Sequence, residues 1–140
     1  MIVLTFQPRF RAMVLSGAKA NTIRADRKRP VKVGDVLSLR GWSGRPYASK
    51  QVVVLDNQRC IRTCPVVVGD HYIEVDGHRC DDAATLYFFA VRDGFNGWAD
   101  LIAYFREQGP LPFVGTLIGW AAAASTPIAS SDTDEIEAIS

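Results

Sequence analysis

GAKANTIRADRKRP, residues 17–30, decides how the chain is interpreted, because it joins a predicted helix to a predicted strand and holds five of the sixteen lysines and arginines. Before it, Ile2–Phe6 is apolar and predicts a strand. Pro8–Ser16 predicts a helix, because proline suits the first turn and the glycine that follows suits the end. Within the stretch, Asn21–Arg24 predicts an extended segment and Ala25–Pro30 a polar loop.

The rest of the chain shows further strand and helix signals. A turn is predicted at Asp56-Asn57, between two strands. Asp82, or Asp81 beside it, is predicted to cap one helix and Asn96 another. About six short strands and two to three short helices predict an α+β fold, either a small barrel or a strongly bent sheet with helices packed on its rim. The remaining predicted strands are Val36–Arg40, Gln51–Leu55, Cys60–Val68, Tyr72–Val75 and Phe113–Trp120, and the predicted helices are Ala83–Arg92 and the stretch between Asn96 and Gly109.

Composition predicts one folded domain, residues 1–120, and a disordered tail, residues 121–140. The chain is 48% hydrophobic and 22% charged, which suits a domain with a real core. The tail is rich in Ala, Ser and Thr, has an acidic stretch and offers little apolar surface to bury. No apolar run approaches the roughly 18 residues of a membrane helix, no signal peptide is recognised, and three cysteines argue against a disulfide framework. We therefore expect a cytoplasmic protein without a membrane segment, and no obligate protein partner is evident.

The net charge of +1 hides a division between the two halves of the chain. Residues 1–62 carry a net charge of +10, and residues 63–140 carry −9. Such a division suggests that the first half presents a surface to a polyanion. Alternatively, folding interleaves the two halves and the charges pair, since position in sequence is not position in space.

The basic cluster supplies the first candidate site. On a strand, Thr22 and Arg24 point to the same face, and Lys19 lies just before them where the chain turns. An amine, a hydroxyl and a guanidinium that converge on one pocket can bind a phosphate or polarise a carbonyl. The alternative is a solvated basic loop without a specific ligand. Residues Arg27, Lys28 and Arg29 extend the cluster and are candidates for contact with RNA.

Three other candidates have both a functional and a structural interpretation. Asp93 stands before a glycine at a predicted helix end, so it either serves a site or only bonds local backbone groups. Trp42 and Tyr47 flank a glycine-rich loop, where they either stack on nucleic-acid bases or pack at the rim of the fold. Asp35 is interpreted as the turn residue of VGDVL.

Cysteine and histidine spacing does not predict a metal site. The spacings Cys-x-x-x-Cys, from Cys60 to Cys64, and His-x-Cys, from His78 to Cys80, are not the usual pairs of zinc ligands. Free thiols in a sheet and exposed turn histidines, including His71, are the better interpretation. The sequence has no glycine-rich motif for a nucleotide cofactor, so no cofactor is predicted.

The elements KANTIR, VKVGDVLSL, RDGF and GTLIGW, in this order, resemble the ASCH domain, which has a PUA-like fold. The resemblance runs from Leu4 to about Trp120, nearly the whole predicted domain. It implies a small β-barrel related to RNA-binding modules. Known relatives include amidohydrolases that remove the acetyl group from acetylated cytidine, ribonucleases and RNA-binding proteins.

The resemblance also implies roles for individual residues. In the amidohydrolase branch, a lysine and a threonine spaced as Lys19 and Thr22 are catalytic, together with a downstream carboxylate that Asp93 matches here. That branch has a glutamate at this position, and the aspartate is one methylene shorter. The compact amidohydrolases also lack the loop Ala25–Lys32 and the stretch Cys60–Cys80.

Two functions from different classes follow. As a hydrolase of an acylated nucleoside or of RNA, the chain would use Thr22 as the nucleophile, Lys19 as the base and Asp93 as the proton relay, while Arg24 anchors the substrate or its oxyanion. As a non-catalytic RNA-binding module, it would use the same cations on phosphates and stack Trp42 or Tyr47 on a base. A closed pocket that contains Lys19, Thr22 and Asp93 favours catalysis, and an open basic groove favours binding.

Overall fold

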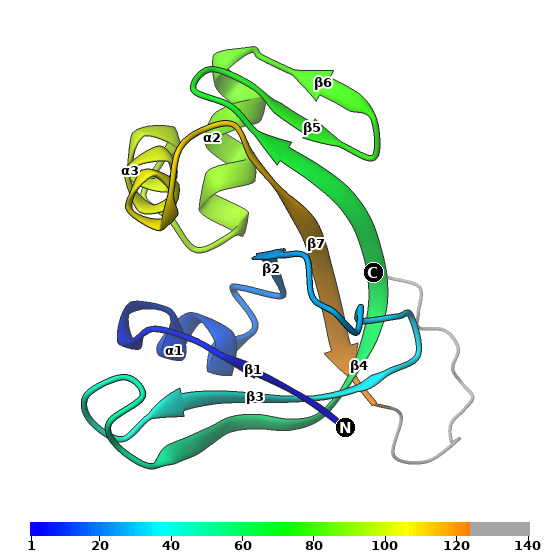
Figure 1. Ribbon diagram of the computed structural model, residues 1–140, viewed down its shortest axis with the longest axis vertical. Coiled ribbons are helices and arrows are strands. Elements are labelled where there is room, and N and C mark those ends of the chain that lie inside the picture. The colour runs from blue at the N-terminus through cyan, green and yellow to red at the C-terminus, as the bar shows by residue number, and fades with distance from the viewer. Residues whose placement is uncertain (124–140) are drawn as a thin grey trace.

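The computed structural model describes residues 1–123, which form seven strands and three helices in mixed order (Figure 1). This confirms the expected α+β class. In chain order the elements are β1 (Ile2–Thr5), α1 (Pro8–Ser16), β2 (Asn21–Ala25), β3 (Val36–Trp42), β4 (Gln51–Val68), β5 (Ile73–Val75), β6 (His78–Cys80), α2 (Ala83–Arg92), α3 (Trp98–Gln108) and β7 (Phe113–Ala122).

The seven strands form one strongly bent sheet that is not closed into a barrel, which corrects the barrel prediction. Its continuous path runs from β2 through β7, β4 and β3 to β1, and β5 and β6 branch from the second half of β4. In Figure 1, β1, β3 and α1 lie on one side of the molecule and α2, α3 and the β5–β6 hairpin on the other, while β4 and β7 curve between them. Within the described chain no backbone pairing joins β1 to β2. A side chain spans these two free strand edges, because Arg24 Nη2 donates a hydrogen bond to the Thr5 carbonyl oxygen at 2.6 Å.

Strand β4 is continuous over 18 residues, so the predicted turn at Asp56-Asn57 is wrong. Asn57 does adopt a left-handed conformation, with φ of 53°, which asparagine tolerates better than most residues. The chain does not reverse there, because Leu37 pairs with Gln58 and Leu39 pairs with Leu55, so the additional residues form a bulge. The bulge bends β4 so that its first half pairs with β3 and its second half with β7.

The helix ends follow the predicted chemistry at most positions. Asp82 caps α2, and its carboxylate accepts hydrogen bonds from the backbone and the hydroxyl of Thr85. Gly17 ends α1 with a φ of 87°. Asn96 does not cap α3; Gly97 does, and the Asn96 N–H donates to the Asp100 carboxylate instead.

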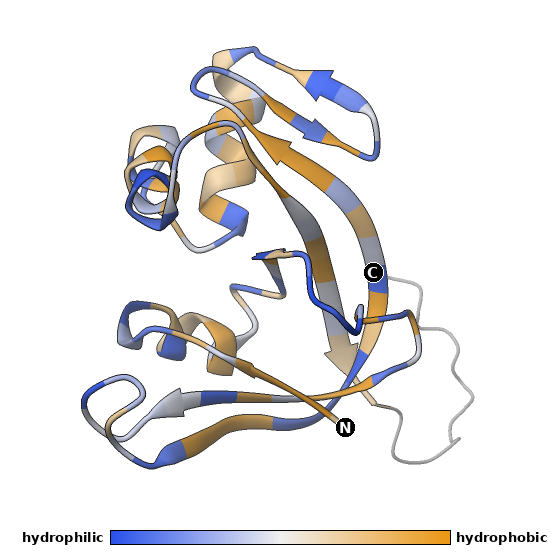
Figure 2. Ribbon diagram, viewed as in Figure 1, coloured by the Kyte–Doolittle hydropathy of each residue, from blue (hydrophilic) through white to orange (hydrophobic). Residues whose placement is uncertain are grey.

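An aromatic cluster joins the two sides of the molecule. Phe10 on α1 packs edge-on against Phe95 and Tyr104, with ring centroids 5.3 and 5.8 Å apart. Figure 2 shows hydrophobic residues along α2, the second half of β4 and parts of β7, both hydrophobic and hydrophilic residues in α1 and α3, and a hydrophilic segment directly after β2. Burial of this apolar surface holds α1 and α3 against the sheet on either side of β2.

The end of the domain lies slightly beyond the predicted boundary. Ala121 and Ala122 belong to β7 and pair with Arg59 and Gln58 of β4, although both were predicted to begin the tail. The rest of the predicted tail, from residue 124, lies outside the described residues. No helix of the described chain is both long and apolar enough to cross a membrane.

Replacement of Gly115 by alanine should lower the free energy of unfolding by about 1–3 kcal/mol, the usual range for overpacking. A Cβ at this position would lie 2.3 Å from the carbonyl oxygen of Arg24, where β7 approaches β2. Gly119 is the matched control, because it also lies on β7 opposite β2 and its added Cβ would meet nothing closer than 3.5 Å. Urea unfolding of both variants checks this. Equal stability of the two variants would contradict the close approach.

Candidate active site

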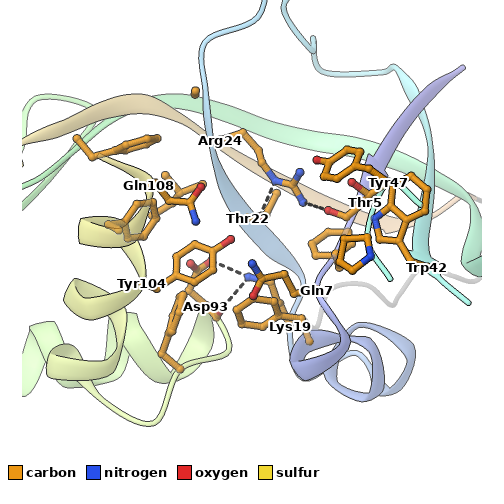
Figure 3. Close-up of a pocket in the computed structure, with 18 residues that line it drawn as sticks. Thr5, Gln7, Lys19, Thr22, Arg24, Trp42, Tyr47, Asp93, Tyr104 and Gln108 are labelled. Atoms are coloured by element: carbon orange, nitrogen blue, oxygen red, sulfur yellow. Dashed lines mark hydrogen bonds and ion pairs between the residues drawn. The ribbon is translucent and has the colours of Figure 1, made fainter. Parts of the chain in front are cut away.

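A cavity of about 410 Å³ opens between α1 and α3, with β2 at its back (Figure 3). This volume lies within the range of small-molecule sites. Lys19, Thr22, Arg24 and Asp93 all line it, and so do Trp42 and Tyr47. The prediction that Lys19, Thr22 and Asp93 share one pocket is thus confirmed, even though 74 residues separate Lys19 from Asp93.

Lys19 is held in the turn between α1 and β2. Because Gly17 ends the helix, the chain reverses, and the Lys19 N–H donates to the Met13 carbonyl oxygen. The lysine is only 2% exposed, and its ammonium lies 5.0 Å from the centroid of the Phe10 ring. Lys19 is therefore a buried residue, although it belongs to a basic stretch of the sequence.

Asp93 meets Lys19 from the opposite side of the cavity. It ends α2 and is 2% exposed, and two of its three oxygens accept from Lys19 Nζ, the backbone oxygen at 2.5 Å and Oδ1 at 3.2 Å. Gly94, with a φ of 96°, leaves room for this approach, because a Cβ there would lie 3.1 Å from Lys19 Cδ. Asp93 therefore does more than bond local backbone groups.

Burial shifts both partners of this pair toward their neutral forms. Desolvation raises the pKa of Asp93 to about 6, although the charge and hydrogen bond of Lys19 oppose the shift. Desolvation likewise lowers the pKa of Lys19 from its ordinary value against the attraction of Asp93. A proton is consequently easier to move within this pair than between two solvated side chains.

Thr22 and Arg24 form a second pair on β2. They lie on one face of the strand, as predicted, and Arg24 Nε donates to Thr22 Oγ1 at 3.2 Å. The guanidinium also lies 4.8 Å from the centroid of the Phe6 ring, and burial lowers its pKa. Among the described residues, the Thr22 hydroxyl bonds only to Arg24 and the Lys19 ammonium only to Asp93.

Aromatic rings form the two walls of the cavity. Trp42 and Tyr47 pack together on one wall, with ring centroids 5.0 Å apart, and Tyr104 faces them from α3 (Figure 3). Burial raises the pKa of the Tyr104 hydroxyl, so it is a neutral hydrogen-bond donor. Trp42 and Tyr47 thus both pack on each other and line the site.

Four polar residues that line the cavity were not predicted from the sequence: Thr5, Gln7, Tyr104 and Gln108. Tyr104 lies in α3 among the apolar residues Leu101, Ile102 and Phe105, so its spacing in the sequence is that of a core residue. Gln7 and Gln108 belong to no motif, since each stands next to a helix end and looks like an ordinary surface residue. The spacing of these residues in the sequence does not show that their side chains face the cavity.

The rest of the basic cluster lies outside the cavity. Arg27 lines an adjoining hollow, and Lys28 and Arg29 are exposed beyond it. Part of the predicted charge division is neutralised across the fold, because Arg9 pairs with Asp100 and Lys19 with Asp93.

Asp35 and the three cysteines do not line the cavity. Asp35 accepts a hydrogen bond from the Lys32 N–H, which confirms it as a turn residue. Cys60, Cys64 and Cys80 are free thiols. In the part of the chain that the structure describes, no three histidine, cysteine or acidic residues are grouped so that they could hold a metal ion.

Comparison of the chain with protein-family models, with curated proteins and with solved structures found no match.

Proposed function

We propose that this chain is an ASCH-type hydrolase that acts on RNA or on a nucleoside derived from it, with the amide bond of an acylated nucleoside as the scissile bond. The observation that carries the proposal is the buried contact of Lys19 with Asp93 beside the Thr22–Arg24 hydrogen bond in one cavity. Lys19 and Asp93 are each only 2% exposed, and a buried ion pair of this kind is costly for stability, so its position in the cavity points to chemistry. The sequence resemblance to the ASCH domain names the substrate class.

Acyl transfer to Thr22 is the first half of the proposed reaction. Thr22 Oγ attacks the amide carbonyl carbon, and its proton passes to Lys19, whose lowered pKa suits a base. The carbon–nitrogen bond then breaks as the Lys19–Asp93 pair returns a proton to the leaving amine. In the second half, water attacks the carbonyl carbon of the acyl-threonine and gives up a proton to the same pair. The pair passes this proton to Thr22 Oγ as the bond between that oxygen and the acyl carbon breaks, which releases the carboxylic acid and restores the threonine hydroxyl.

Arg24 supports both halves by electrostatics. Its Nε donates to Thr22 Oγ1, so it stabilises negative charge as that oxygen loses its proton. Its Nη2 bond to the Thr5 carbonyl oxygen fixes the plane of the guanidinium before substrate arrives. In a buried site such a fixed charge is more effective than in water.

The walls of the cavity suit a flat heterocycle. The Trp42–Tyr47 pair offers one aromatic surface and Tyr104 a second. Stacking of a base on aromatic rings contributes about 1–3 kcal/mol per base. The amides of Gln7 and Gln108 supply donors and acceptors for the edge of the ring.

Incubation of the full chain with a panel of acetylated and otherwise modified nucleosides tests the proposal. Acetylated cytidine should release cytidine and acetate in equal amounts, measured by chromatography. Single-stranded RNA in the same assay distinguishes amide hydrolysis from RNA cleavage. If the folded protein turns over neither the panel nor RNA, the hydrolase proposal fails.

Non-catalytic RNA binding is the second candidate, favoured by the exposed run of Arg27, Lys28 and Arg29 that follows β2. In the described chain none of the three forms a salt bridge. Three cations side by side without acidic partners suit a phosphate backbone.

Affinity for single-stranded RNA should therefore depend strongly on salt. Each neutralised phosphate contributes about −0.7 to the slope of log affinity against log salt, so three to five contacts give roughly −2 to −3.5. Replacement of Arg27, Lys28 and Arg29 by alanine should flatten the slope, whereas Lys19→Met, at a buried position, should change it by at most one contact. Fluorescence anisotropy over a salt series measures both. A flat dependence in the unmodified protein rules out the polyanion surface.

A further inference from the structure

A second hollow of about 250 Å³ adjoins the candidate active site. It lies along the free edges of β1 and β2, where the sheet stays open, so no strand fills it. Three of its residues, Thr5, Arg24 and Ala25, also line the main cavity, so the two spaces meet at Arg24. Its lining consists of Val3, Leu4, Thr5, Arg24, Ala25 and Arg27.

Two cationic side chains, those of Arg24 and Arg27, line this hollow. Arg27 forms no side-chain hydrogen bond or salt bridge within the described chain, and the neighbouring Asp26 accepts instead from the Thr116 hydroxyl. Burial is the main cause that lowers the pKa of Arg24, and the charges of Tyr104, Asp93 and Tyr47 oppose it. Repulsion by the Arg27 guanidinium is a smaller cause that also lowers this pKa, so the two guanidiniums interact electrostatically. An anion between them would relieve this repulsion.

We propose that the second hollow binds a phosphate on the sugar of the nucleoside whose acylated base occupies the main cavity. The preferred substrate is then a nucleotide, and Arg27 determines that specificity. The inference rests on the proposed function for the identity of the base. It adds a second subsite, in which Arg27 and the outer face of Arg24 hold the phosphate while Thr22 faces the acyl group.

The arrangement of the two subsites supports this assignment. Arg24 already uses Nε on Thr22 and one Nη on Thr5, so its remaining N–H donors are free for a ligand. Val3, Leu4 and Ala25 supply apolar walls, against which a charge-assisted hydrogen bond is stronger than in open water. Lys28 and Arg29 follow directly and steer a phosphate toward the hollow.

Turnover of acetylated cytidine and of its 5′- and 3′-monophosphates measures the specificity. We expect kcat/KM to be ten- to a hundredfold higher for one monophosphate than for the nucleoside, the value of one or two charge-assisted hydrogen bonds. Arg27→Ala should bring this ratio close to one, and Arg27→Lys should retain part of it. Lys50→Ala, at an exposed cation that lines neither space, should leave the ratio unchanged. The position of the preferred phosphate identifies the end of an RNA chain that would fit.

Calorimetric binding of cytidine and cytidine monophosphate separates this inference from the hydrolase proposal, because neither ligand is hydrolysed. If no acetylated compound is turned over but the monophosphate binds at least tenfold more tightly and Arg27→Ala removes the difference, the hydrolase proposal fails and the phosphate subsite stands. If acetylated cytidine is hydrolysed but its monophosphates show no preference, or Arg27→Ala keeps the preference, the phosphate subsite is overturned and the hydrolase proposal stands.

Discussion

Thr22→Val should abolish hydrolysis of acetylated cytidine, with a loss in kcat on the order of 10³-fold or more. Valine has the shape of threonine but no hydroxyl, so it removes the proposed nucleophile with little change in volume. Thr22→Ser restores the hydroxyl and should retain a measurable part of the activity. Steady-state release of cytidine by the three proteins is the measurement. A valine variant with activity near that of the unmodified protein would show that Thr22 does not attack the substrate.

A control for structural damage is needed, because Thr22 is buried and accepts a hydrogen bond from Arg24. Removal of that acceptor should cost about 1 kcal/mol of stability, much less than the catalytic effect. Thr116 is the matched control, since its hydroxyl also bonds a charged side chain, Asp26, at the far end of the same β2–β7 pairing. Thr116→Val should lose similar stability and keep its turnover.

Local sequence signals predicted most elements of the fold. The helix Pro8–Ser16 agrees at both ends, because a proline and a glycine mark them. The strand β5 lies within the predicted strand Tyr72–Val75, although β6, which follows the turn at Asp76-Gly77, was not predicted. The prediction failed at Asp56-Asn57, where turn-forming residues make a bulge, because pairing with β3 on one side and β7 on the other keeps β4 extended.

Sheet closure depends on contacts between distant segments, which local signals do not determine. The pattern of strands was compatible with both a barrel and a bent sheet. In the structure β1 and β2 do not pair with each other, and the Arg24 side chain bridges them through Thr5. This opening is also where the second hollow forms, so the departure from the predicted barrel produces part of the proposed site.

The site residues that were predicted from the sequence are those whose side chains form a recognisable chemical group along the chain or match the family pattern. Lys19, Thr22 and Arg24 stand together in sequence, and the family resemblance added Asp93. Tyr104 and Gln108 were missed because an aromatic and an amide on an amphipathic helix are common in proteins without a site. Only the packing of α3 opposite β2 brings them to the cavity.

Lys19→Met should destabilise the protein by about 3–5 kcal/mol at pH 8, because it leaves the Asp93 carboxylate buried without its partner. The loss should be much smaller at pH 5. Asp93 in the folded protein has a pKa of about 6, above its ordinary value of 3.8, so its contribution to stability is complete below pH 3.8 and is lost as pH rises through 6. Without the charge and hydrogen bond of Lys19, which lower it, this pKa rises further. At pH 5 the carboxyl is then protonated and needs no cation.

The double variant Lys19→Met, Asp93→Asn isolates the cause of this destabilisation. It removes both charges, so at pH 8 it should be more stable than Lys19→Met alone, and its stability relative to the unmodified protein should vary less between pH 5 and pH 8. Urea unfolding of the unmodified protein and of the two variants at both pH values supplies the four differences in the free energy of unfolding. Arg9→Met is the control for loss of an exposed pair, that with Asp100, and should cost at most about 1 kcal/mol at either pH. If Lys19→Met is equally destabilised at pH 5 and pH 8, then lost packing, not the unpaired carboxylate, is responsible, and Asp93 is not the titrating group of the site.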